Sequence, residues 1–152
     1  MTAVTWLEGV HHVGFSVADI ERSVAFWERL LGARARFRGR LDRPYLGESV
    51  GYPGVAIEAA LIDLPGGGLL ELLDYQVERS PNPDARANPG NVHICLRVSD
   101  ADTAWNRAVQ AGARPSRADG PVEVDTGPNR GARVAYFHDP DGISFEIYQP
   151  AA

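Results

Sequence analysis

The sequence predicts an α+β fold built from two tandem modules, each running strand, helix and three further strands. Three observations predict it: apolar residues alternate with a period of two in short segments, two other segments carry apolar residues at helical spacing, and the order of these segments occurs twice. The chain has 152 residues, 44% of them hydrophobic, which is enough to bury a core. We therefore interpret residues 1–152 as a single domain made of two related halves.

The first strand is expected at 9–17. Side chains in a strand point alternately to its two faces, so Val13 and Phe15 share the packed side and His12 points to the opposite side. By the same alternation, His11 is expected to face the helix side.

The first helix is expected directly after this strand. Asp19 is a favourable N-cap, and Gly32 stands where a C-terminal glycine ends a helix. Between them, Val24 and Trp27 belong to an apolar stripe at helical spacing. We expect this helix to cover the apolar side of the strand.

Three extended segments complete the first half. An arginine-rich stretch begins at Ala33, and strands are expected at 55–64 and after the Gly-rich turn at 66–68. The last strand has Glu71 between leucines, and burying a lone carboxylate there would be costly without a positive partner. The arginines of the first stretch are interpreted as a solvated strand edge, and the alternative is that some of them meet an anionic substrate group. They are Arg34, Arg36, Arg38, Arg40 and Arg43.

The second half repeats this order. Module one is placed at 8–75, a Pro- and Asn-containing linker at 76–90, and module two at 91–149. His93 lies 81 residues after His12. Regular offsets of this kind indicate an internal repeat, whose halves pack together because each has a marginal core on its own.

Glu146 lies 75 residues after Glu71 and, like it, alternates with apolar neighbours. His12, Glu71, His93 and Glu146 are therefore expected on the side of the strands that faces away from the helices. Two imidazoles and two carboxylates form a ligand set for one divalent metal ion, and mixed nitrogen and oxygen ligands suit Ni, Co, Zn, Mn or Fe rather than Ca.

Composition excludes several other functions. A formal net charge of -5 with scattered signs argues against nucleic acid as a partner. Neither a signal peptide nor a membrane span is recognisable, so we expect a cytoplasmic protein. The single cysteine, Cys95, excludes an intrachain disulfide and is expected to be a small core residue.

The repeated motifs resemble those of the vicinal oxygen chelate superfamily, over residues 8–149. This superfamily includes glyoxalase I, methylmalonyl-CoA epimerase, extradiol dioxygenases, fosfomycin-resistance enzymes and bleomycin-resistance proteins. The resemblance implies a curved mixed sheet with the metal site in its concave face. The motifs that carry it are His12-Val13-Gly14-Phe15, Leu70-Glu71-Leu72, His93-Ile94, Asp139-Pro140-Asp141-Gly142 and Phe145-Glu146.

The resemblance also implies an activity. A metal-dependent lyase or isomerase of the glyoxalase or epimerase type abstracts a proton next to a metal-chelated carbonyl of a small oxygenated metabolite. The base is Glu71, Glu146 or Glu48, and relatives of this kind commonly form homodimers. The sequence leaves open whether the four ligands come from one chain or from two.

Candidate pocket residues follow from the strand faces. Tyr148 shares the face of Glu146, and Arg97 shares the face of His93, where it suits a carboxylate or phosphate group. Tyr75 and Tyr136 are further candidates for the lining of a substrate pocket.

Two alternatives remain at this point. An extradiol-type dioxygenase would bind Fe(II) through two histidines and one glutamate, and a non-catalytic protein would sequester an antibiotic or metabolite. Asp74-Tyr75-Gln76 stands where glyoxalase I usually has Asn-Trp-Gly, which contributes to glutathione binding. This departure disfavours glutathione as the substrate.

Overall fold

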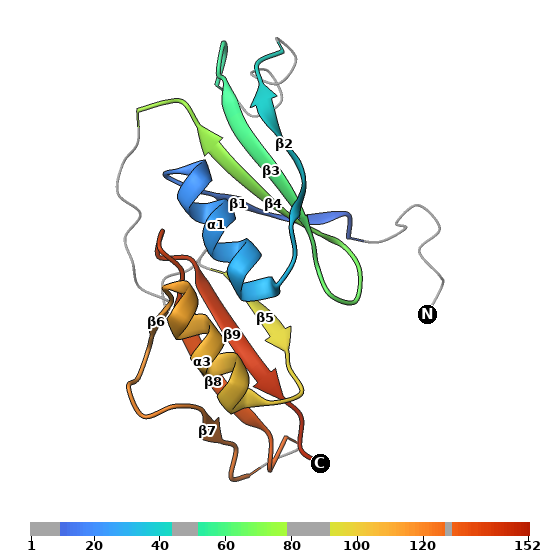
Figure 1. Ribbon diagram of the computed structural model, residues 1–152, viewed down its shortest axis with the longest axis vertical. Helices are drawn as coiled ribbons and strands as arrows, with labels where there is room; N and C mark the ends of the chain where they lie inside the picture. The colour runs from blue at the N-terminus through green and yellow to red at the C-terminus, as the bar shows by residue number, and fades with distance from the viewer. Residues whose placement is uncertain (1–9, 44–51, 79–91, 127–128) are drawn as a thin grey trace. The chain divides into compact units, whose positions relative to one another are not determined.

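The computed structural model of the protein describes residues 10–43, 52–78, 92–126 and 129–152. Glu48 and most of the expected linker lie outside these ranges. The described residues form two mixed sheets and two helices, which confirms the α+β class (Figure 1). None of the helices in the described part of the chain is long and apolar enough to span a membrane.

The first half contains one helix and a four-stranded sheet with strand order β1-β4-β3-β2. β1 and β4 are parallel, and the other neighbours are antiparallel. Alternation is as expected, because Leu70 and Leu72 are fully buried while Glu71 between them is half-buried. The elements are β1 (His12–Ser16), α1 (Ile20–Leu31), β2 (Ala35–Leu41), β3 (Ile57–Asp63) and β4 (Leu69–Tyr75).

The second half repeats the parallel pair at one edge, with strand order β5-β9-β8-β6. The single β2 of the first half has two short counterparts here, β6 and β7, both paired with β8. Pro115 and Pro121 lie in and between them, and proline cannot donate to a strand ladder. The elements are β5 (His93–Arg97), α3 (Ala101–Ala111), β6 (Arg114–Pro115), β7 (Val122–Glu123), β8 (Arg133–His138) and β9 (Ser144–Gln149).

Helix α1 begins at the predicted cap, Asp19, and α3 begins at the equivalent residue of the second half, Asp100. The Asp19 carboxylate accepts a hydrogen bond from the backbone N–H of Arg22, and that of Asp100 accepts one from Thr103. α3 ends at Gly112, whose φ of 107° lies in the left-handed region that favours glycine. The repeat therefore extends to the hydrogen bonds that start each helix.

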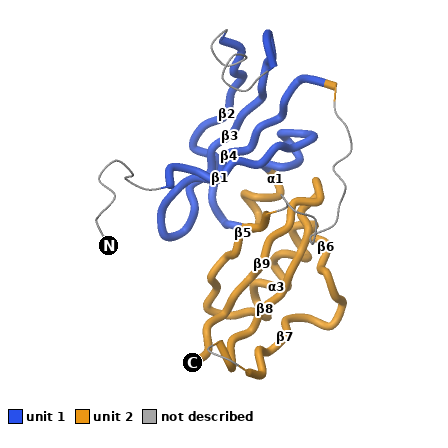
Figure 2. The backbone as a smooth tube through the Cα atoms, turned by 180° about the vertical axis from the view of Figure 1, so that it is seen from behind, with its two compact units in different colours: residues 1–24, 31–77 blue, residues 25–30, 78–152 orange. Residues whose placement is uncertain are grey.

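Helix α1 belongs to two compact units. The first unit comprises residues 1–24 and 31–77, and the second comprises 25–30 and 78–152 (Figure 2). In the second unit Trp27 and Phe26 pack against Phe145, with ring centroids 5.6 and 6.1 Å apart. Sequence periodicity identified one apolar stripe on this helix, whereas the structure also buries Phe26, because residues 25–30 contribute to the core of the second unit.

Asp139 organises the turn before β9. Its Oδ1 accepts hydrogen bonds of 2.8 Å from the N–H groups of Asp141 and Ile143, and its Oδ2 accepts one of 3.3 Å from Trp27 Nε1. The side chain is fully buried, and burial raises its pKa despite these donors. This carboxylate therefore joins α1 to the turn that leads into the strand of Glu146.

We expect Asp139→Ala to lower the free energy of unfolding by about 2–4 kcal/mol, because three N–H groups lose their acceptor in a buried place. Urea unfolding monitored by tryptophan fluorescence measures this loss.

The pKa of Asp139 adds a pH dependence. Because this pKa lies higher in the folded than in the unfolded chain, the folded chain binds more protons between the two values, and stability falls as pH rises through that window. Asp139→Asn lacks this titration, so its stability should fall less over the same window. Equal pH slopes for the wild type and Asp139→Asn would contradict the assignment.

Candidate metal centre

Each half of the molecule holds one imidazole–carboxylate pair. In the first unit, His12 Nε2 lies 3.2 Å from Glu71 Oε2. In the second unit, His93 Nε2 lies 3.2 Å from Glu146 Oε2. The same two atoms meet at the same distance in both units.

Strand register produces both pairs. In the parallel ladder of β1 and β4, His12 lies opposite Leu69 and Gly14 opposite Glu71. The ladder of β5 and β9 has the same register, since His93 lies opposite Ser144 and Cys95 opposite Glu146. In each ladder the glutamate is displaced by two residues from the histidine, so the two side chains share a face and meet diagonally.

Gly14 keeps the diagonal in the first unit open. A Cβ atom at this position would lie 3.6 Å from Glu71 Oε2 and 3.9 Å from His12 Cδ2. These are ordinary contact distances, so a larger side chain would extend into the region where the imidazole and carboxylate meet. In the second unit, Cys95 occupies the equivalent place.

The exposure of the four side chains suits a ligand site. The imidazoles of His12 and His93 are 41% and 39% exposed, whereas the carboxylates of Glu71 and Glu146 are 23% and 14% exposed. The imidazoles are thus accessible, while the carboxylates are partly desolvated, which would strengthen their attraction for a cation.

The donor pairs fit a divalent metal ion. Metal–ligand bonds of about 2.0–2.2 Å, at angles from octahedral to tetrahedral, place two neighbouring ligand atoms about 2.8–3.6 Å apart. The observed 3.2 Å lies within this range. Among the described residues no group of three or more His, Cys, Asp or Glu side chains is placed to hold a metal ion, and each unit contains one histidine–glutamate pair.

The remaining predicted site residues are not part of the two histidine–glutamate pairs. Arg97 is exposed on the face of His93, directly opposite Tyr148 in the β5–β9 ladder. Tyr148 donates a long hydrogen bond of 3.5 Å to Asn129 Oδ1. Tyr75 lies on the face of Glu71, where its ring contacts Tyr52 at 6.0 Å. Glu48 lies outside the described residues.

The prediction for Cys95 is wrong. It was expected in the core, but it is exposed, because alternation along β5 places it on the same face as His93. Partial burial of its sulfur and the neighbouring Glu146, which accepts a hydrogen bond from the thiol, raise the pKa of Cys95 to about 11. The thiol therefore stays protonated at neutral pH and is a weak nucleophile.

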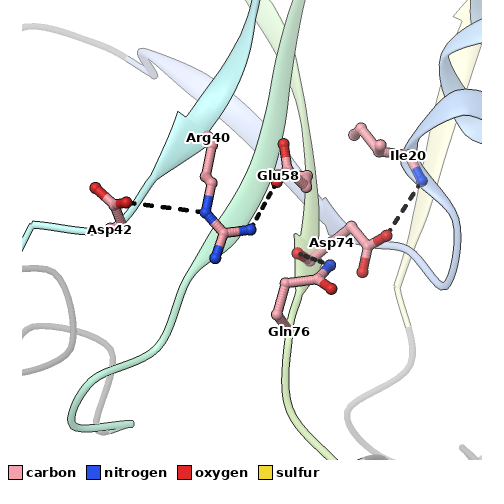
Figure 3. A network of polar contacts seen from close by, with 6 residues as sticks. All are labelled: Ile20, Arg40, Asp42, Glu58, Asp74 and Gln76. Carbon is pink, nitrogen blue, oxygen red and sulfur yellow. Dashed lines mark hydrogen bonds and ion pairs between the residues drawn. The ribbon is translucent and has the colours of Figure 1, made fainter.

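Asp74 has a structural contact that its position in the sequence did not reveal. It lies on the buried side of β4, where its carboxylate accepts a hydrogen bond of 3.3 Å from the N–H of Ile20, and Gln76 donates to its carbonyl (Figure 3). The contact places a negative charge at the N-terminus of α1, where the helix dipole favours it.

The arginines of β2 meet carboxylates of their own unit. Arg36 pairs with Asp63, Arg38 with Glu21, and Arg40 with Glu58 and Asp42. These contacts support the interpretation as a solvated strand edge.

Two ring contacts involve residues that the sequence did not rank highly. The ring of Tyr136 lies 5.3 Å from that of His93. His11 was expected to face the helix side, but it is exposed and its ring lies 5.2 Å from that of His12. β1 begins only at His12, so strand alternation does not extend to residue 11.

The family is established by comparison. The model of the Glyoxalase/Bleomycin resistance protein/Dioxygenase superfamily matches residues 9–147. The chain therefore belongs to this superfamily, as its motifs predicted.

Individual relatives include enzymes of two kinds. The chain is 30% identical over 141 residues to lactoylglutathione lyase from Salmonella typhimurium, covering 91% of this chain and 90% of the lyase. It is 28% identical over 149 residues to 2-epi-5-epi-valiolone epimerase from an Actinomyces species, covering 91% of this chain and 77% of the epimerase.

A solved structure has the same fold over the full chain. The glyoxalase family protein from Bacillus cereus superimposes with a TM-score of 0.82 at 19% identity, covering 100% of both chains.

We expect Glu71→Gln and Glu146→Gln to weaken the binding of a divalent cation such as Zn²⁺ about 10- to 100-fold each, because an amide oxygen is a poorer ligand than a carboxylate. Isothermal titration calorimetry with the purified protein measures both affinities. Asp63→Asn, on an exposed strand end, is the control for loss of a carboxylate. Unchanged affinity in Glu71→Gln would assign this residue a role other than ligand.

Proposed function

We propose that this protein is a metal-dependent lyase or isomerase that abstracts a proton next to a carbonyl group of a small oxygenated metabolite. In this proposal, His12, Glu71, His93 and Glu146 hold one divalent ion. The family includes metal-dependent enzymes such as lactoylglutathione lyase and epimerases, and the finer assignment rests on this chain's own residues.

The observation that carries the proposal is the identity of the two pairs. A histidine and a glutamate meet through the same atoms, at 3.2 Å and in the same strand register, in each half. The helix caps also repeat, but they join a side chain to the backbone, whereas each of these pairs joins two side chains of metal-ligand type with an exposed imidazole. A metal ion coordinated by both pairs would require the same two types of ligand residue in each half, which accounts for their identity.

The metal ion and the side chains would have different roles in the reaction. When bound, a divalent ion would supply Lewis acidity that polarises two neighbouring substrate oxygens and stabilises the negative charge left by proton removal. A carboxylate takes the proton from the carbon, and the candidates are Glu71, Glu146 and Glu48, of which Glu48 lies outside the described residues.

The surroundings of the two carboxylates differ. Across the sheet, Glu71 lies between Gly14 and Leu61, neither of which has a polar side chain. Glu146 lies between Cys95, whose thiol donates to it, and Tyr136. Because their neighbours differ, we propose that the two carboxylates have unequal roles in proton transfer.

Several neighbouring residues are suited to substrate binding. Arg97 and Tyr148, opposite each other on β5 and β9, would bind an anionic or hydroxyl group. Tyr75 would contact an apolar part of the substrate on the first sheet. The glutathione-binding stretch of glyoxalase I is replaced here, and Asp74 is buried against α1. We therefore propose a substrate other than a glutathione adduct.

Metal analysis tests the ligand set. Protein purified without added metal and then titrated with Ni²⁺, Co²⁺ or Zn²⁺ should bind one ion per chain, because the two pairs share it. Two ions per chain would mean that each pair binds its own, and no tight binding would refute the metal-dependent activity.

Turnover distinguishes the reaction classes. With Zn²⁺ or Ni²⁺ bound, exchange of a substrate C–H proton with D₂O should be catalysed, and replacement of the base by glutamine should lower kcat by about 10²- to 10⁴-fold. Proton exchange followed by NMR over a panel of small hydroxy-ketones and 2-oxo acids measures it. Oxygen consumption with a catechol, supported only by Fe²⁺, would instead identify a dioxygenase. Stoichiometric binding without exchange would identify a sequestering protein.

A further inference from the structure

His11 has a contact that the proposed function does not use. Its Nδ1 lies 2.9 Å from Nδ1 of His12, and the two rings meet nearly perpendicularly, at an interplanar angle of 85°. His11 is exposed, so burial in the core does not account for its position. The contact engages the nitrogen of His12 that points away from Glu71, because Nε2 of the same ring faces that carboxylate.

The hydrogen bond between the rings has two possible directions. Two neutral imidazoles at this distance share one proton, so one Nδ1 donates and the other accepts. If His11 donates, His12 carries its own proton on Nε2 and donates it to Glu71. If His12 donates, its Nε2 has a free lone pair, and His11 carries its proton on Nε2.

We propose that His11 is a positioning residue for His12, and that the hydrogen bond between them reverses direction when His12 binds a cation. This inference rests on the proposed ligand role of His12. Without the cation, the first arrangement satisfies both contacts of the His12 ring. With a cation on His12 Nε2, only the second arrangement is possible. His12 then carries its proton on Nδ1 and donates a hydrogen bond from it to His11 Nδ1.

The reversal conserves protons and charge. His12 loses the proton on Nε2 and gains one on Nδ1, while His11 loses the proton on Nδ1 and gains one on Nε2, both by exchange with water. Each ring stays neutral throughout. A histidine ligand generally donates its second ring N–H to an acceptor, which sets its tautomer and orientation, and His11 supplies that acceptor within the same segment.

The second half shows that the fold itself does not require this contact. The residue that precedes His93 is Val92, which is 73% exposed and has no side-chain nitrogen or oxygen. There the imidazole contacts the ring of Tyr136 instead, and the corresponding neighbour of Glu71 in the first half is Leu61. Each candidate ligand histidine thus contacts another ring, that of His11 in the first half and that of Tyr136 in the second.

Nitrogen NMR of the full-length chain tests the reversal directly. Two-bond ¹H–¹⁵N correlation spectra report which nitrogen of each ring is protonated. Without metal, we expect the proton of His12 on Nε2 and that of His11 on Nδ1. On addition of Zn²⁺, we expect both to move to the other nitrogen. A His11 tautomer that does not respond while His12 binds Zn²⁺ would overturn the proposal.

Variants test the consequence for affinity. His11→Ala should weaken Zn²⁺ binding about tenfold, with the thermal unfolding midpoint unchanged. His11→Asn should restore most of the affinity, because its amide oxygen can accept from His12 Nδ1. Val92→Ala is the matched control in the second half and should bind as the wild type does.

The outcomes separate this inference from the proposed function. If His11→Ala binds Zn²⁺ as tightly as the wild type, His11 does not position His12, and the metal site stands. If the wild type itself binds no Zn²⁺, the proposed metal site fails, and the reversal fails with it.

Discussion

The register of two parallel strand pairs is the constraint on which the candidate site depends. In both ladders the glutamate lies two residues beyond the position opposite the histidine. Shifting either ladder by one residue would move the glutamate to the apolar side of its sheet, where a charge is costly. The burial of Leu70 and Leu72 on one sheet, and of Phe145 and Ile147 on the other, therefore also holds the carboxylates on the polar face.

The two halves are alike in their histidine–glutamate pairs and unlike in the residues that surround these pairs. Glycine, leucine and a second histidine surround the pair in the first half, whereas cysteine, tyrosine and valine occupy the equivalent places in the second. Under the proposed function, these unequal neighbours would distinguish the carboxylate that takes the proton from the one that does not. The asymmetry is a property of the side chains, since the strand register is the same in both halves.

Two buried carboxylates outside the candidate site, Asp139 and Asp74, have structural roles. Asp139 collects three N–H donors, including the indole of Trp27, and Asp74 accepts from the first turn of α1. Both connect a helix to a strand end, and each is satisfied by donors from its own unit. Sequence alone does not distinguish such structural carboxylates from candidate metal ligands. In both cases the sequence shows only an acidic residue in or beside an apolar strand.

The sequence by itself determined the α+β class, the repeat, the helix caps and the polar faces that carry His12, Glu71, His93 and Glu146. These follow from spacing along the chain, because strand alternation and capping are local. Only the tertiary structure decided the diagonal contacts of 3.2 Å, the exposure of Cys95, the division of α1 between two units and the contact of His11 with His12. Strand register and ring orientation depend on partners distant in the chain or on the point where a strand begins, and no local pattern specifies either.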